Sequence, residues 1–173
     1  SVVQCVVCEG DMDAAYQIAV GLFLEFSRDP FTHYRKARSY AGDAWPLRRA
    51  DIIAVLQKPA DGRGGDAHKL ADVFVEEKMW EDLLALVQQH PQLASIYGKR
   101  LEALFPHEIA RVYAANLEHE SAYAGGRDAY RANCDMVRTI RKLGCADIAE
   151  NIIAAWREKY PRRRALMEEL DRM

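Results

Sequence analysis

Apolar side chains recur at every third or fourth position from Lys69 to Leu117, and turns interrupt them only at Lys78, Pro91 and Pro106. This periodicity predicts short amphipathic helices. A pair of such helices cannot bury its apolar face alone, so neighbouring pairs have to stack on one another to form a core. The stretch therefore predicts antiparallel helices stacked in pairs.

Three helix turns resemble one another, around Gly10, Lys78 and Gly144. In each, the Gly or Lys is followed by two variable residues, then Asp or Glu, then an apolar helix. With Gly42 and Pro106 as weaker equivalents, successive turns lie 28 to 38 residues apart, near the period of about 34 residues of tetratricopeptide-type helix pairs. We predict an all-α fold of about ten to eleven helices, a degenerate tetratricopeptide-like α-solenoid. An irregular all-α bundle is the alternative.

The chain has 173 residues, the size of one domain, and we predict a single helical-repeat domain over residues 1–173. One clear loop, residues 58–66, contains three glycines and a proline. It is predicted to be a flexible connection, either a surface insertion or a boundary between subdomains. Pro46 is predicted to begin a helix. The apolar face of that helix would consist of Leu47, Ala50, Ile53, Ala54 and Leu56.

The composition argues against several classes of protein. The formal net charge is −2, and residues of both signs are interspersed. The chain therefore has no strong overall electrostatic field that would attract nucleic acid or a membrane surface. The longest apolar run, residues 18–24, has seven residues, far fewer than the roughly 20 of a membrane-spanning helix. Because Ser1 is not an initiator methionine, we expect the chain to begin within a longer protein. We expect that protein to be cytoplasmic and away from membranes.

The spacing of the four cysteines does not complete a metal or redox motif. Cys5 and Cys8 have the C-x-x-C spacing of a zinc or redox pair, but neither a second such pair nor a matching histidine pair is present. We therefore predict buried, reduced thiols, and the same for Cys134 and Cys145. No metal or cofactor is expected.

No catalytic motif is complete in the sequence. His107-Glu108 and His119-Glu120 begin like H-E-x-x-H, but neither has the second histidine. The glycine-rich loop lacks the P-loop signature. We predict that the chain is not an enzyme. An enzymatic function would require folding to gather groups such as His90, His107 and Glu108 into one cleft.

Arginines and aromatic residues occur together in two stretches, one around residues 34–49 and one on a helix predicted over residues 127–143. Such clusters bind acidic peptides or phosphate backbones; the alternative is a solvated helix face held by ion pairs. The candidate partner-binding residues are Tyr34, Arg35, Arg38, Trp45, Arg127, Tyr130, Arg131 and Arg138.

Two stretches of the sequence carry a family resemblance. They are residues 9–15 (EGDMDAA) and a closing stretch with Arg127, Tyr130, Leu143-Gly144 and the residues of 156–171 that follow the pattern W-R-x-x-Y-x-R-R-x-A-L-M-x-x-L-D. They resemble the helical C-terminal region of bacterial SWIM zinc-finger family proteins, over the first thirty residues or so and the last third of the chain. The resemblance implies a tetratricopeptide-like solenoid downstream of a C-x-C…C-x-H zinc module. That module is not in this sequence.

These observations predict a non-enzymatic module that binds a protein or peptide partner, as the C-terminal part of a larger bacterial protein. The alternative is a nucleic-acid-associated module that uses the tyrosine- and arginine-rich helix faces. That alternative predicts an affinity that falls steeply with salt.

Overall fold

The computed structural model of the chain describes residues 11–25, 30–58 and 66–173. Throughout these ranges the regular elements are helices and none is a strand, which confirms the all-α prediction. No helix in the described ranges is long and apolar enough to cross a membrane. Cys5, Cys8 and the turn at Gly10 lie outside the described residues, and the predicted number of helices stays a prediction for the same reason.

The chain divides into two compact units, Ser1–Leu70 and Ala71–Met173. The division falls inside helix α5 (Ala67–Glu76), just after the loop predicted at residues 58–66. Most of that loop, residues 59–65, lies outside the described residues. The single domain and the role of the loop as a boundary therefore stay predictions.

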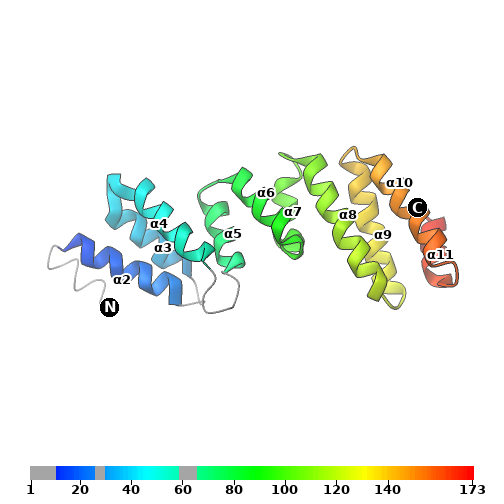
Figure 1. Cartoon of the computed structure of the whole chain (residues 1–173), viewed down its shortest axis with the longest axis horizontal. Coiled ribbons are helices and arrows are strands. Elements are labelled where there is room, and N and C mark those ends of the chain that lie inside the picture. The colour runs from blue at the N-terminus through cyan, green and yellow to red at the C-terminus, as the bar shows by residue number, and fades with distance from the viewer. Residues whose placement is uncertain (1–10, 26–29, 59–65) are drawn as a thin grey trace. The chain divides into compact units, whose positions relative to one another are not determined.

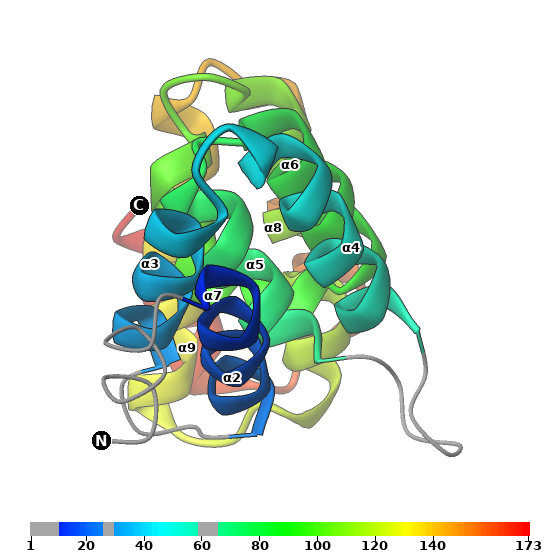
Figure 2. The ribbon, with the colours of Figure 1, turned by 90° about the vertical axis from the view of Figure 1, so that its left-hand side faces the viewer.

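The first unit contains α2 (Met12–Glu25), α3 (Pro30–Ala41), a short 3-10 helix (Gly42–Ala44) and α4 (Trp45–Gln57). Helices α2 and α3 pack side by side (Figures 1 and 2). Three aromatic rings join the helices: the ring centroid of Tyr34 lies 5.0 Å from that of Phe23 and 5.1 Å from that of Trp45. Edge and tilted contacts of this kind are the favoured geometry for buried aromatic pairs.

The apolar face predicted for α4 is wrong in part. Leu56 is buried as predicted, but Leu47 is 71% exposed, and Ala50 and Ala54 are exposed as well. The other buried side chains of this helix are Trp45 and Ile52, which are not on the predicted face. Trp45 is anchored by its contact with the ring of Tyr34, and this contact orients the helix so that Leu47 faces away from the core.

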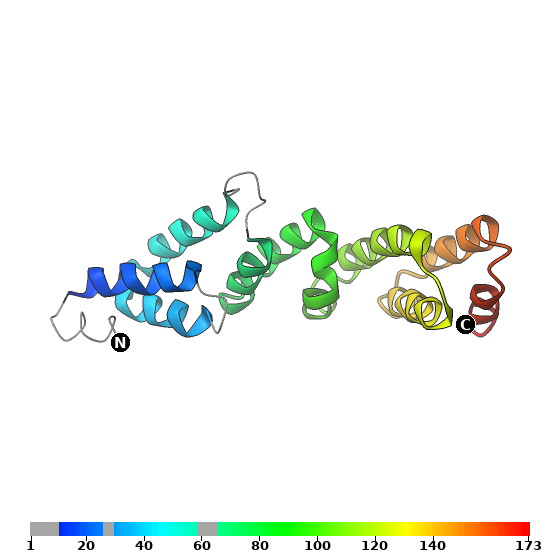
Figure 3. The same ribbon diagram turned by 90° about the horizontal axis from the view of Figure 1, so that it is seen from below.

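The second unit continues from α5 with α6 (Trp80–Gln89), a 3-10 helix (Pro91–Leu93), α7 (Ala94–Leu101), α8 (Pro106–Tyr123), α9 (Arg127–Lys142), α10 (Ala146–Lys159) and α11 (Arg164–Asp171). From α6 to α10, each helix packs against the next. In addition, α8 contacts both α6 and α10, and α9 contacts α11. Figure 3 shows α8 and α10 in one row and α9 and α11 in another, so the helices of this unit form two layers.

The turns predicted to be equivalent at Lys78 and Gly144 share one backbone geometry. Both residues adopt a positive φ, 57° at Lys78 and 83° at Gly144. After Lys78, the amide of Met79 donates to the carbonyl of Phe74 (2.8 Å); after Gly144, the amide of Cys145 donates to that of Ile140 (3.3 Å). This bonding closes a helix with a left-handed residue and is usually built on glycine.

Replacing Lys78 with glycine is expected to raise the free energy of unfolding by about 0.5–1 kcal/mol, because a left-handed conformation strains any residue with a Cβ atom. Urea denaturation of the full chain measures the change. Lys78→Ala, which removes the charge but keeps the Cβ atom, is the matched control and should not stabilise the protein. An equal gain from both substitutions would show that the charge, and not the backbone, limits this turn.

Candidate functional site

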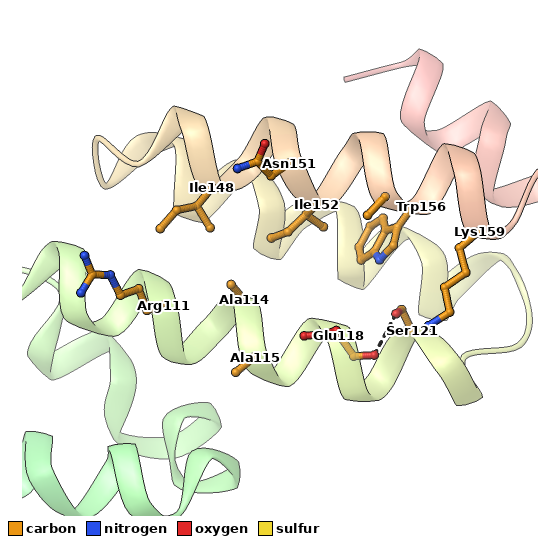
Figure 4. Close-up of a pocket in the computed structure, with 11 residues that line it drawn as sticks. Arg111, Ala114, Ala115, Glu118, Ser121, Ile148, Asn151, Ile152, Trp156 and Lys159 are labelled. Atoms are coloured by element: carbon orange, nitrogen blue, oxygen red, sulfur yellow. Dashed lines mark hydrogen bonds between the residues drawn. The ribbon is translucent and has the colours of Figure 1, made fainter.

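A groove of about 490 Å³ lies between α8 and α10 in the second unit. The two helices run in the same direction along its sides (Figure 4). Apolar side chains line most of it: Ala114, Ala115, Ile148, Ile152, Ala155 and Trp156. Ile148 and Ile152 are only half-buried, and Ala115 and Ala155 are exposed. The groove therefore presents apolar surface that no residue in the described part of the chain covers.

Helical spacing explains why these residues line one groove. Residues three and four positions apart share one face of a helix, and α8 contributes residues 111, 114, 115 and 118. Helix α10 contributes residues 148, 151, 152 and 155. Each position in the second row follows its counterpart in the first by 37 residues, so the two parallel helices present matching rows.

The two ends of the groove differ in charge. Arg111 lies at the end nearest Ile148, and Lys159 lies at the end nearest Ser121 (Figure 4). Glu118 lines the groove towards the Lys159 end, so a negative charge accompanies that lysine. Arg111 is exposed and makes no ion pair with any residue in the described ranges. Lys159 makes no ion pair in the described ranges either, but Glu118 lines its side of the groove, so the Lys159 end has lining residues of both signs and the Arg111 end has only a positive one.

The aromatic residues predicted to bind a partner are core residues. Tyr34, Trp45 and Tyr130 are all buried, so their ring faces are not available to a partner, and these three assignments are wrong. The apolar body of an aromatic ring is worth most when it is buried. Arg35 and Arg38 are exposed on α3, and their proposed role in binding stays a prediction.

The arginines of α9 are paired with carboxylates. Arg127 contacts Glu168 (2.5 Å), Arg131 lies 4.0 Å from the buried Glu169 and 3.8 Å from Asp128, and Arg138 contacts Asp135 (2.5 Å). The structure thus favours the ion-paired helix face that the sequence left as the alternative. A nucleic acid or acidic peptide would have to displace these carboxylates to reach the three cations.

Comparisons with known proteins do not assign this chain to a family. Comparisons of the chain with family models, with curated proteins and with solved structures find no match. The resemblance to the helical region of SWIM zinc-finger proteins therefore stays a prediction.

The structure pairs two residues that the sequence treated separately. The imidazole Nδ1 of His107, at the start of α8, lies 3.1 Å from the Sγ atom of Cys145, immediately before α10. Cys134 and Cys145 are both buried, as predicted, and burial raises the pKa of the Cys134 thiol. In the described ranges, no cluster of three His, Cys, Asp or Glu side chains could hold a metal ion.

Sequence reasoning missed the groove. Ile148, Ile152 and Arg111 belong to no site that the sequence predicts. The available signal was the matching spacing of residues 111–118 and 148–155 on two predicted helices. This matching spacing indicates a shared groove only once α8 and α10 are known to be neighbours.

Proposed function

We propose that this chain is a non-enzymatic protein interaction module, and that the groove between α8 and α10 binds a segment of a partner protein. The module would be a degenerate tetratricopeptide-like α-solenoid. In this proposal it forms the C-terminal part of a larger cytoplasmic bacterial protein. The observation that carries the proposal is the open apolar groove with half-buried Ile148 and Ile152.

Three observations support the solenoid. Helices two apart in the chain contact each other, α8 with α10 and α9 with α11. The turns at Lys78 and Gly144 share one geometry. The rows that line the groove on α8 and α10 are 37 residues apart. Repeated helix pairs in a solenoid create surfaces of this kind, which such proteins use for binding.

The apolar surface of the groove favours a role in binding over a role in stabilising the fold. Apolar surface in water costs roughly 25 cal/mol per Å², and a stable core would be expected to bury side chains such as Ile148 and Ile152. Contiguous apolar surface rimmed by polar groups usually marks an interaction site. The rim here includes Arg111, Glu118, Asn151 and Lys159.

A photo-reactive amino acid at Asn151, an exposed position that lines the groove, tests the proposal in cells. We expect a defined covalent adduct that mass spectrometry identifies. The adduct should disappear when Ile152→Glu is added. Ala154→Glu, which places the same charge at an exposed position of α10 outside the groove, should leave it intact.

The same photo-reactive residue at Ala132, an exposed position of α9, is the control for random collisions. If Asn151 and Ala132 give the same adducts, or if Ile152→Glu leaves the Asn151 adduct unchanged, the groove is not the binding surface.

A further inference from the structure

We propose that the groove binds an extended segment of four to five residues whose core is apolar and whose Arg111 end carries an acidic side chain. This inference rests on the proposed function and specifies its partner. It follows from the dimensions of the groove and from the charge at each of its ends.

The length of the groove sets the number of residues bound. From Arg111 to Ser121, α8 advances ten residues, which corresponds to roughly 15 Å at 1.5 Å per residue. An extended chain rises about 3.3 Å per residue, so about four to five residues span the groove.

The spacing of two isoleucines in the groove matches an extended chain. Ile148 and Ile152 both line the groove and are four positions apart on α10, which is roughly 6 Å along the helix at 1.5 Å per residue. Alternate side chains of an extended chain point to the same side and are roughly 6.6 Å apart. An extended backbone can therefore turn alternate side chains towards both isoleucines.

Charge sets the direction of the bound segment. At one end, Arg111 has no ion-pair partner in the described part of the chain. At the other end, Lys159 lies 5.5 Å from the centre of the Tyr160 ring and shares the groove with Glu118. A carboxylate on the partner is stabilised most beside Arg111, because a planar guanidinium can donate two parallel hydrogen bonds to a carboxylate. The acidic residue is therefore placed at that end.

The test is a selection of random seven-residue peptides, displayed on phage, against the immobilised full chain. Parallel selections use Arg111→Glu, Ile152→Glu and Arg100→Glu. Arg100 is an exposed arginine of α7 outside the groove, so its variant is the matched control for charge. We expect apolar residues at alternate positions with Asp or Glu at one end. Such peptides should bind Arg111→Glu at least about tenfold more weakly, and selection on that variant should replace the acid with Lys or Arg.

Other outcomes of this selection would each contradict a specific part of the proposal. Enriched peptides with no acidic preference, or with equal affinity for Arg111→Glu and Arg100→Glu, overturn the charge assignment. Apolar residues spaced by three and four overturn the extended conformation. In both cases, loss of binding to Ile152→Glu leaves the proposed function standing. If no enriched peptide depends on Ile152, the proposed function fails as well.

Discussion

Gly98→Ala is expected to lower the free energy of unfolding by about 2 kcal/mol, although alanine is normally the better helix former. Gly98 lies within α7, and a Cβ atom there would stand 2.4 Å from the hydroxyl oxygen of Tyr113 and 2.8 Å from its Cε1 atom. Overpacking a close-packed site costs about 1–3 kcal/mol, whereas the gain in helix propensity is at most about 1 kcal/mol. The loss from overpacking should therefore dominate.

The ring of Tyr113 has little room to retreat. It is buried, and its hydroxyl donates to Glu102 Oε1 at 3.0 Å. Burial, with this hydrogen bond as the second cause, raises the pKa of Tyr113 well above its usual range. Moving the ring would break the hydrogen bond that fixes it.

Gly21→Ala in α2 is the control for Gly98→Ala, because a Cβ atom at Gly21 meets nothing within 4 Å. It should stabilise the protein by up to about 1 kcal/mol. Urea denaturation followed by circular dichroism measures both variants in the full chain. If the two substitutions stabilise the protein equally, α7 and α8 do not pack as closely as described.

Arg163→Met is expected to lower the free energy of unfolding by about 2–3 kcal/mol, because it leaves the carboxyl end of α8 without its donors. The Arg163 guanidinium donates to the carbonyl oxygens of Ser121 (2.7 Å), Ala122 (3.3 Å) and Ala124 (3.4 Å). It also lies 4.0 Å from the centre of the Tyr160 ring. Hydrogen bonds from charged donors contribute about 1.5–3 kcal/mol.

The neighbouring arginine is the matched control. The side chain of Arg164 is 93% exposed, and among the described residues it pairs only with Glu168 on its own helix, so Arg164→Met should cost less than about 0.5 kcal/mol. Urea denaturation compares the two variants, and amide hydrogen exchange should show faster exchange near Ala124 in Arg163→Met alone. Equal losses of stability from both substitutions would contradict the role given to Arg163.

The elements of the fold were predictable where the signal is local. Proline at the start of α8 and glycine before α10 mark helix ends through backbone geometry, and α9 ends within one residue of its predicted limit. Lys78 was recognised as equivalent to Gly144 because the residues around the two turns match. The positive φ of Lys78 agrees with that equivalence.

The packing of the helices was less predictable because it depends on partners far apart in the chain. Periodicity alone did not identify the buried face of α4, where a ring contact between Trp45 and Tyr34 decides the orientation. The pairing of Arg127 with Glu168 joins α9 to α11. The sequence of α9 alone shows an arginine-rich face, but it does not show the acidic residues of other helices that neutralise those arginines.

The candidate site was the least predictable feature. The apolar groove requires α8 and α10 to lie side by side, and its charge asymmetry depends on which charged residues of the two helices line each end. Of the arginines predicted to bind a partner, those on α9 are paired with carboxylates, whereas Arg111, which is not among them, makes no ion pair with any described residue. Ion pairing across helices is a property of the tertiary structure that spacing in the sequence does not carry.

The most direct test of the account is the affinity of the full chain for the partner identified by the adduct at Asn151, compared between Ile152→Glu and Ala154→Glu. Residues at the centre of an interface contribute 2 kcal/mol or more, so Ile152→Glu should weaken binding by at least about thirtyfold with an unchanged thermal midpoint. Ala154→Glu should bind like the unmodified chain. Equal affinities of the two variants would contradict the assignment of the groove between α8 and α10 as the binding surface.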